Sequence, residues 1–442
     1  MSPLVSLPLR RLIRVSFSLR SVVTLFLCCL VSSVSGQRPG FNYDEDKVPE
    51  YTLPDPLVSE DGSKITSAFQ WTGARRAEIL ALFEEHMYGR RAGRPRVKML
   101  STEAVEAGVL NGKAHRRELV IRYEDVSPDF EMRVLLYVPV TEGPHPVFLG
   151  YNFNGNHTVQ ADPGITLSDK WMRRGNESGN VNHRATDAAR GLSASRWPVE
   201  MIIDRGYALA TVYYGDVEPD HAEGWKDGVR AHIQEDQSGQ ALDLEDWSAI
   251  SAWAWGLSLV VDEFATLPDI DSARVAVIGH SRLGKTSLWA GAADPRFALV
   301  ISNNSGCGGA ALSRRAFGET VERINTSFPH WFCQTFKQYN ANEGALPIDQ
   351  HMLIALMAPR PVYIASAKED QWADPNGEFL SGKHAGPVYE LFGKSGVGVD
   401  KQPPVNQPVG DYIGYHIRTG KHDVTAYDWE QYLNFADRHL TH

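Results

Sequence analysis

The residues best suited to chemistry in this sequence are a serine, a histidine and an acid that lie far apart along the chain. Ser281 stands in the stretch VAVIGHSRLGK (275–285), where a short apolar run leads into Gly279 and a polar turn. A strand, a tight turn with a serine between small residues, and a following helix make up the nucleophile elbow of serine hydrolases. The start of the helix places backbone N–H groups where a negatively charged oxygen would develop. The stretch therefore predicts a nucleophilic Ser281.

The pattern departs from the generic GxSxG motif in one respect. Its second glycine comes one place late, at Gly284. On the local sequence alone, the alternative interpretation of Ser281 is a serine that only caps a helix, as in many α/β proteins.

A serine nucleophile needs a base and an acid that orients the base. His422 lies in GKHD (420–423), ahead of a final helix in which Thr425 and Asp428 fit a capping box. The buried stripe of that helix is predicted to contain Trp429, Leu433 and Ala436. The acid is expected after a late strand, and KED follows the apolar run at 362–367. Asp370 is the first choice and Glu369 the second.

These residues must be held by a regular framework, and the sequence predicts one in which strands alternate with helices. Strands are expected at 118–122, 133–138, 146–152, 207–213, 275–278, 299–303 and 362–367, and helices at 72–89, 245–266, 284–293, 346–357 and 425–440. This alternation is typical of a doubly wound, mostly parallel sheet with helices on both faces. Residues 152–200 are rich in Asn, Gly, Arg and Ser and predict a loop insertion over one end of the sheet.

The chain divides into three parts. Four arginines (Arg10, Arg11, Arg14 and Arg20), an apolar run at 22–34 and small residues at 35–36 predict a secretory signal over 1–36, hence a secreted or periplasmic protein. A permanent membrane anchor is the alternative, but the run is short for a bilayer span. Residues 37–70 are expected to form an extended arm, and 71–442 a single catalytic domain.

Composition excludes some classes of partner and cofactor. The 442 residues carry 44 Lys and Arg against 54 Asp and Glu, a net charge of −10, so a general electrostatic grip on nucleic acid or an anionic membrane is not expected. No nucleotide or metal motif is present, and neither a cofactor nor a metal is expected. Cys307 and Cys333 are open to two interpretations, one disulfide or two buried thiols.

Several longer stretches resemble a known family. GHSRLGKTSLWAGA, SNNSGCGGAALSRR, FPHWFC, LPIDQHMLIALMAPRPVY and GYHIRTGKHD are similar to the glucuronoyl esterases, carbohydrate esterase family 15, in their bacterial form. The resemblance covers about residues 70–440. It implies an α/β-hydrolase fold and hydrolysis of the ester between (4-O-methyl)-D-glucuronic acid on xylan and an alcohol of lignin.

The resemblance also assigns roles by position. Ser281 matches the nucleophile, His422 the base, and Arg282 the arginine that helps to hold the oxyanion. The residues that match glucuronate-binding positions are Lys285, Glu319 and Trp372. A salt bridge between Lys285 and Glu319, and a core position for Trp372, are the alternatives.

One position departs from the family pattern. Many members carry a catalytic glutamate where this chain has Asn304, and an amide has no charge to stabilise an imidazolium. Some bacterial relatives carry an acid that matches Asp370 instead. The resemblance and the residues therefore agree on Asp370, and Asn304 is interpreted as a polar remnant near His422.

Two other functions remain open. One is a different exported carbohydrate esterase, acting on acetyl or feruloyl groups. The other is a catalytically inactive sugar-binding homologue. The expected oligomeric state is a monomer. The natural alcohol, and the tolerance for galacturonate or for the 4-O-methyl group, are not fixed by the sequence.

Overall fold

The structure is a computed structural model that describes residues 37–95, 98–102, 105–127, 129–173 and 179–440. The signal expected over 1–36 lies outside these residues. Within the described ranges, no helix combines the length and the apolar character needed to cross a membrane.

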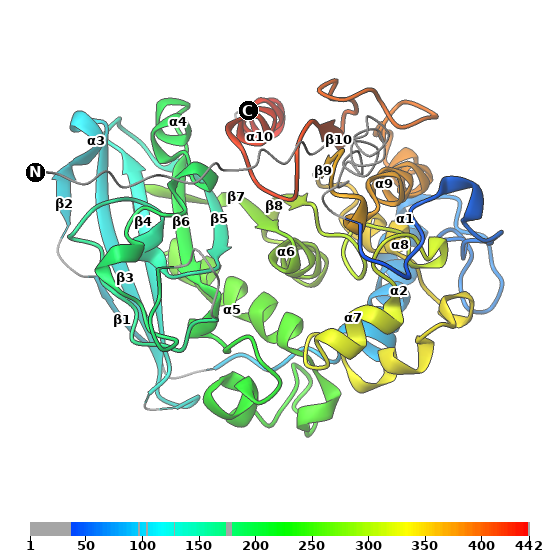
Figure 1. Ribbon diagram of the computed structural model, residues 1–442, viewed down its shortest axis with the longest axis horizontal. Coiled ribbons are helices and arrows are strands. Elements are labelled where there is room, and N and C mark those ends of the chain that lie inside the picture. Colours follow the sequence, from blue (N-terminus) through cyan, green and yellow to red (C-terminus); the bar gives the residue numbers. More distant parts are fainter. Residues whose placement is uncertain (1–36, 96–97, 103–104, 128, 174–178, 441–442) are drawn as a thin grey trace, which may run out of the picture. The chain divides into compact units, whose positions relative to one another are not determined.

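One mixed sheet forms the centre of this part of the chain (Figure 1). Its strands follow the order β1-β3-β4-β6-β5-β7-β8-β9-β10, with β2 paired to β3. The pairs from β6 to β10 are parallel, whereas β1, β3, β4 and β6 pair antiparallel. The bounds are β1 Lys98–Thr102, β2 Glu106–Gly108, β3 Ala114–Tyr123, β4 Glu131–Pro139, β5 His145–Asn152, β6 Ala208–Tyr213, β7 Ile270–His280, β8 Phe297–Asn303, β9 Val362–Ala367 and β10 Ile413–Arg418.

Helices cover both faces of the sheet because its strands are apolar on both sides. Along β5, Val147 and Leu149 belong to one core and Phe148 to the other. Helices α2, α5, α6, α8 and α9 pack on the first core, and α4 and α10 on the second (Figure 1). The bounds are α1 Ala68–Gln70, α2 Arg76–Phe83, α3 Val109–Gly112, α4 Val199–Asp204, α5 Ala249–Phe264, α6 Arg282–Ala293, α7 Val321–Ser327, α8 Gln350–Ala355, α9 Pro375–Glu390 and α10 Ala426–Leu440. The chain thus has the mostly parallel, two-faced α/β architecture that the alternating pattern predicts.

The first helical region begins earlier than its sequence suggests. The side chain of Ser67, rather than Thr72, caps it by accepting a hydrogen bond from Gln70 N at 3.3 Å. Thr72 lies inside a widened helical turn that continues into α2. The predicted end is correct, because Gly89 has φ 85° and a Cβ there would lie 2.3 Å from Trp247 Cα. The Thr72 cap is therefore wrong.

Seven further elements have no counterpart among the predicted ones: β1, β2, β10, α3, α4, α7 and α9. The insertion at 152–200 is irregular, as predicted, apart from short 3-10 turns and the start of α4. Of the two interpretations of the cysteines, the structure has the second, because Cys307 and Cys333 are buried free thiols.

Candidate active site

The nucleophile elbow occupies the junction between β7 and α6. β7 ends at His280 and α6 begins at Arg282, so Ser281 alone makes the turn, with φ 57° and ψ −127°. Such a conformation is strained for a residue with a side chain, and it is the conformation that an elbow requires. A Cβ at Gly279 would lie 1.9 Å from the Leu283 carbonyl oxygen, so only glycine fits there.

The late second glycine also has a structural reason. Gly284 lies in the first turn of α6, where a Cβ would come within 3.0 Å of Ser305 Cβ and 3.1 Å of the Gly279 carbonyl oxygen. Leu283, at the place of the generic glycine, is buried and does not disturb the turn. The elbow therefore forms although the sequence deviates from GxSxG.

The predicted base and the predicted acid come from loops that follow neighbouring strands. His422 lies between β10 and α10, and Asp370 follows β9. His422 Nδ1 is 2.6 Å from Asp370 Oδ2, and the same oxygen accepts a hydrogen bond from Asn304 Nδ2 at 2.8 Å. The Asp370 side chain is 5% exposed and that of His422 43%. Glu369, the second choice for the acid, is exposed to solvent.

The loop that carries His422 is closed by a buried carboxylate. Asp428, in α10, accepts hydrogen bonds from Arg418 Nε at 2.7 Å and from the Thr425 hydroxyl and N–H, both at 2.7 Å. His416 Nε2 lies 3.0 Å from the same carboxylate. Arg418 ends β10 and Thr425 precedes α10, so Asp428 fixes both ends of the loop. The Thr425–Asp428 pairing predicted as a capping box is present.

A second histidine packs against His422. The ring of His280 lies 4.4 Å from the His422 ring, centroid to centroid, and its Nδ1 is 2.6 Å from Asn303 Oδ1. Burial, together with the nearby His422, holds the pKa of His280 well below its usual value. His280 is therefore neutral near pH 7, and it supports the His422 ring without adding charge.

A buried acid lies behind Asp370. Glu378, in α9, accepts hydrogen bonds from the Ser366 hydroxyl at 2.6 Å and from Gly306 N at 3.0 Å. Burial raises the pKa of Glu378 to about 8, and the negative charge of Asp370 acts in the same direction. Near pH 7 Glu378 therefore holds a proton and adds no negative charge of its own behind Asp370.

Arg282 is held beside the nucleophile by a charge and by two aromatic rings. Its Nη1 lies 3.3 Å from Asp220 Oδ2, and its guanidinium carbon lies 5.1 Å from the ring centres of both Phe153 and Trp331. Its Nε is buried without a hydrogen-bond partner among the described residues. The guanidinium is therefore fixed at the elbow and keeps a donor unused.

Asp220 is the carboxylate that pairs with the Arg282 guanidinium. It also contacts Arg173 Nη1 at 3.0 Å, His330 Nε2 at 2.9 Å and Trp331 Nε1 at 2.7 Å. Burial alone would raise the pKa of Asp220, but Arg282 and these other partners more than offset it, and the pKa lies far below its usual range. Asp220 is thus ionised at any physiological pH.

A first cavity of about 520 Å³ opens in front of Ser281. All seven predicted site residues line it: Ser281, Arg282, Lys285, Glu319, Asp370, Trp372 and His422. No ion pair between Lys285 and Glu319 is found among the described residues, and Lys285 Nζ donates to the Ser305 carbonyl oxygen. Trp372 is half-buried. The structure thus brings the predicted residues around one space.

The two charged side chains deep in this cavity are both affected by burial. Burial lowers the pKa of Lys285, and the neighbouring Glu319 opposes that shift. Burial likewise raises the pKa of Glu319, opposed by Lys285 and by Arg38 of the N-terminal arm. Each charge therefore stabilises the other.

A second cavity, of about 540 Å³, meets the first at the nucleophile. Ser281, Arg282 and His422 line both cavities. Most other side chains of the second cavity come from the loop after β5, from the insertion and from the loop after β6, and they include Phe153, Asn154, Arg173, Leu192, Ser195, Arg196 and Tyr214. His280 at the end of β7 and Asp423 beside His422 line it as well. The expected position of the insertion near the site is thus seen at Leu192 to Arg196.

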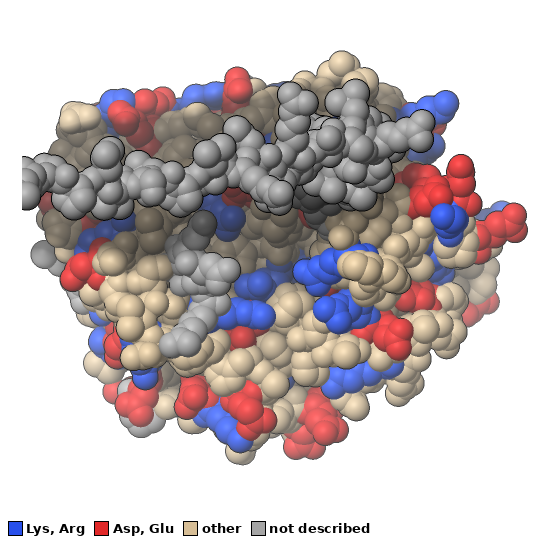
Figure 2. All heavy atoms as spheres, viewed as in Figure 1, with Lys and Arg blue, Asp and Glu red and all other residues tan. Residues whose placement is uncertain are grey.

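The site is more cationic than the protein as a whole. Figure 2 shows Lys and Arg side chains around a hollow near the centre of one face, with Asp and Glu gathered toward its lower and right-hand edges. Five cationic side chains line the two cavities: Arg38, Arg173, Arg196, Arg282 and Lys285. Three acidic side chains, Glu319, Asp370 and Asp423, line the cavities as well, so cations outnumber acids here although the chain as a whole is acidic.

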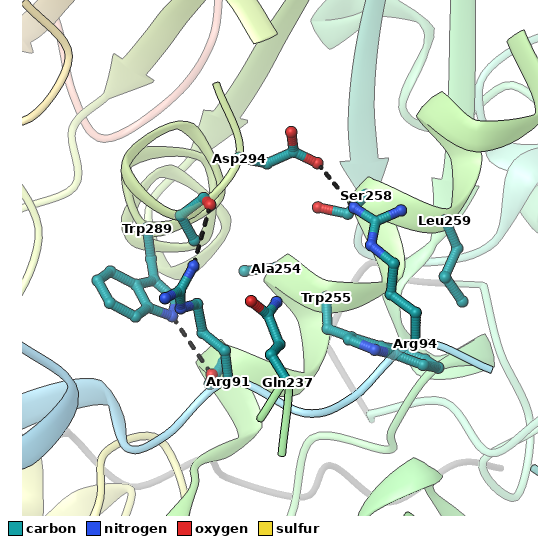
Figure 3. Close-up of a pocket in the computed structure, with 11 residues that line it drawn as sticks. Arg91, Arg94, Gln237, Ala254, Trp255, Ser258, Leu259, Trp289 and Asp294 are labelled. Atoms are coloured by element: carbon teal, nitrogen blue, oxygen red, sulfur yellow. Dashed lines mark hydrogen bonds and ion pairs between the residues drawn. The ribbon is translucent and has the colours of Figure 1, made fainter. Parts of the chain in front are cut away.

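A third and much smaller cavity lies away from these residues. It measures about 30 Å³ and is enclosed by α5, the end of α6 and the segment that carries Arg91 and Arg94 (Figure 3). Arg94 pairs there with Asp294, and Arg91 donates to the Ala293 carbonyl oxygen. It has room for little more than water, and none of the predicted residues lines it.

Sequence reasoning missed Asp220, Glu378, His280 and Arg38. Asp220 and Glu378 are acids at apolar or loop positions whose partners lie far away in the chain, so local sequence gives no signal for them. His280 adjoins the nucleophile and could have been noted from that alone. Arg38 lies two residues after the end of the expected signal, in a stretch where no sequence motif indicates a functional site.

The family model for fungal glucuronyl esterases matches residues 241–393. The chain is 52% identical over 410 residues to carbohydrate esterase MZ0003 of an unknown prokaryotic organism, covering 92% of this chain and 94% of that protein. It is 26% identical over 424 residues to 4-O-methyl-glucuronoyl methylesterase 1 of Wolfiporia cocos, covering 91% and 80%. A solved glucuronoyl esterase from Solibacter usitatus superposes with a TM-score of 0.83 at 49% identity, covering 89% of this chain and all of that one.

Proposed function

The chain belongs to the glucuronoyl esterases of carbohydrate esterase family 15, and on that premise we propose that it hydrolyses the ester between (4-O-methyl)-D-glucuronic acid on xylan and an alcohol of lignin. The observation that carries the proposal is the meeting of two cavities at Ser281 and His422, with Asp370 bonded to the histidine. An ester has two halves, and a site with two compartments at the nucleophile has a place for each.

The first cavity is the place for the uronosyl half. Lys285, Glu319 and Trp372 offer a donor, an acceptor and an aromatic face around a space of sugar size. Lys285 and Glu319 balance each other's charge, which suits hydroxyl groups rather than an ion. These three residues are the proposed glucuronate-binding set.

The second cavity is the place for the alcohol. In ester cleavage the base returns its proton to the leaving oxygen, so the leaving group must lie beside His422. Phe153, Leu192 and Tyr214 supply apolar surface there, and Arg173 and Arg196 supply cations that can stack on aromatic rings. These features favour an aromatic alcohol over a small aliphatic one.

The proposed reaction follows from the geometry. Because Asp370 holds Nδ1 of His422, the other ring nitrogen is left to take the proton of Ser281. Ser281 Oγ attacks the uronoyl carbonyl, and Arg282 with the N-terminus of α6 stabilises the tetrahedral oxyanion. The alcohol leaves with the proton from His422, and water then releases the uronic acid from the serine by the same steps. A fixed oxyanion donor contributes about 3–4 kcal/mol to such a step.

Among the described residues, Asn304 hydrogen-bonds to the proposed acid and not to the proposed base. Its amide donates to the carboxylate oxygen that His422 contacts, so it is proposed to orient Asp370 rather than to replace it. No charge is needed at Asn304 for that task.

We further propose that the protein acts outside the cytoplasm as a monomer. The predicted signal over 1–36 supports export, either to the periplasm or out of the cell. The arm over 37–70 and the catalytic domain over 71–442 are the proposed parts of the mature chain.

The test compares the wild type with Ser281→Ala on a benzyl ester of glucuronic acid. Hydrolysis by the wild type and its loss in the variant are expected. Acetylated xylan and methyl ferulate serve as competing substrates. Preference for either would favour an acetyl or feruloyl esterase, and oligosaccharide binding without hydrolysis of any ester would favour an inactive sugar-binding protein.

A further inference from the structure

The N-terminal arm reaches the first cavity. Gln37 and Arg38 line it together with Ser281. The guanidinium carbon of Arg38 lies 4.1 Å from the centre of the Trp372 ring, and the ring of Phe41 meets Trp372 edge-on at 4.9 Å. The start of the arm thus touches the aromatic residue that is proposed to bind the sugar.

The arm is anchored just beyond Arg38. The Asn42 carbonyl oxygen accepts a hydrogen bond from Gly318 N at 2.8 Å. The Glu45 carboxylate accepts two from Arg315 Nη2, at 2.8 and 2.9 Å. Gly318 and Arg315 lie directly ahead of Glu319 in the chain, so the arm is bound to the segment that carries a proposed sugar-binding residue.

A hydrogen bond within the arm sets the position of Arg38 itself. Its backbone N–H donates to the Tyr43 hydroxyl at 2.7 Å, and the Tyr43 ring packs edge-on against Phe317. Arg38 is therefore held in place by the following residues of its own segment.

Arg38 differs from the other cations of the first cavity. Arg282 is paired with Asp220, and Lys285 Nζ is bonded to the Ser305 carbonyl oxygen. The Arg38 guanidinium stacks on Trp372, and no ion pair to it is found among the described residues. A stacked guanidinium keeps its N–H edge available, with up to five donors in one plane.

We infer that the arm completes the sugar-binding cavity, and that Arg38 is a specificity-determining residue that donates hydrogen bonds to hydroxyl or glycosidic oxygens of the uronosyl saccharide. This inference rests on the proposed function. A planar donor stacked on Trp372 extends the aromatic surface with a polar edge, a combination suited to a ring that carries several oxygens. Because these oxygens do not react, the contact is equal in the bound substrate and in the transition state and acts on KM.

The experiment measures kcat and KM for benzyl glucuronate and for 4-nitrophenyl acetate, an ester without a sugar. The variants are Arg38→Gln, which removes the charge, and Arg38→Met, which keeps an unbranched side chain over Trp372. Lys47→Gln is the matched control, because it removes one positive charge from the arm at a side chain that is 74% exposed and paired with Asp44.

Both Arg38 variants are expected to raise KM for the glucuronate about 5- to 30-fold with kcat nearly unchanged, the range for losing a charge-assisted hydrogen bond at a partly exposed site. Hydrolysis of the acetate and all constants of Lys47→Gln should stay at the wild-type level. An unchanged KM in both Arg38 variants overturns the inference, as does recovery by Arg38→Met alone, which would show that Arg38 only supports Trp372. A wild type without activity on benzyl glucuronate refutes the proposed function instead.

A binding measurement separates affinity from turnover. In a Ser281→Ala background, calorimetric titration with benzyl glucuronate should show weaker binding by a similar factor when Arg38→Gln is added. Equal affinity with and without Arg38→Gln would overturn the inference even if KM had changed.

Discussion

Replacing Asp370 with asparagine isolates the charge of the acid from its geometry. His422 Nδ1 and Asn304 Nδ2 both contact one oxygen, Oδ2, at 2.6 and 2.8 Å. An asparagine with its amide oxygen at that position accepts both hydrogen bonds, because both neighbours are donors. The Asp370→Asn variant should therefore keep the orientation of the histidine and lose only the negative charge.

The size of the effect follows from the distance and the exposure. Opposite charges about 4 Å apart attract by about 4 kcal/mol at an effective dielectric constant of 20. Asp370 is 5% exposed but His422 is 43% exposed, so water reduces this attraction. We expect kcat to fall about 10²- to 10³-fold, which is less than the roughly 10⁴-fold loss seen where an amide also favours the wrong tautomer of the histidine.

The assay is steady-state hydrolysis of benzyl glucuronate, with Asp370→Ala as a second variant. Glu369→Gln is the matched control, since it removes a charge one residue earlier from an exposed side chain. It should remain within about twofold of the wild type, as surface substitutions usually do. Near wild-type kcat in both Asp370 variants, or an equal loss in Glu369→Gln, would refute the assignment of the acid.

Three further outcomes are expected. Asp220→Asn should lower kcat on benzyl glucuronate more than it raises KM, and should lower the melting temperature, because it leaves the buried Arg282 charge unbalanced at a cost of about 3 kcal/mol or more; equal kcat would contradict the role of Arg282. In the folded protein Glu378 keeps its proton up to about pH 8, whereas in the unfolded chain it releases the proton near pH 4.5. The free energy of unfolding of the wild type should therefore decrease by up to about 5 kcal/mol as the pH rises from 4.5 to 8. Thermal unfolding of Glu378→Gln should therefore show a gain over the wild type at pH 8 that is absent at pH 4.5, and parallel curves would count against it. Gly279→Ala should lower the free energy of unfolding by roughly 3 kcal/mol or more, because the added Cβ would overlap a backbone carbonyl. Gly73→Ala, where a Cβ meets nothing within 4 Å, should leave the melting temperature unchanged or raise it in the same experiment.

The parts of the fold that the sequence predicts well are those with a strong local pattern. The run at 362–367 is apolar apart from Ser366 and has the same bounds as β9. β10 was missed because it contains His416 and Arg418, which read as polar. Both are buried, and Asp428, which contacts both, lies beyond the loop. The hydrophobic pattern along one strand does not reveal that a residue in another element, such as Asp428 in α10, makes it possible to bury polar side chains there.

The same limit applies to the site. Ser281 and His422 stand in local settings that predict their roles, so the sequence was enough to propose them. The contact of Arg38 with Trp372 and that of Asp220 with Arg282 join segments that only the folded sheet brings together. Neither arginine has a neighbour in sequence that reveals its partner.

The order of the strands explains why the acid can be an aspartate. The loops after β8, β9 and β10 carry Asn304, Asp370 and His422 in turn, and adjacent strands are about 4.8 Å apart. A carboxylate that follows β9 is one strand away from the imidazole, and the short side chain spans that gap. From β8 a side chain would have to cross twice that interval, and the side chain of Asn304 contacts Asp370 instead of bridging the whole gap. The place of β9 beside β10 thus decides which loop can present a carboxylate to the imidazole.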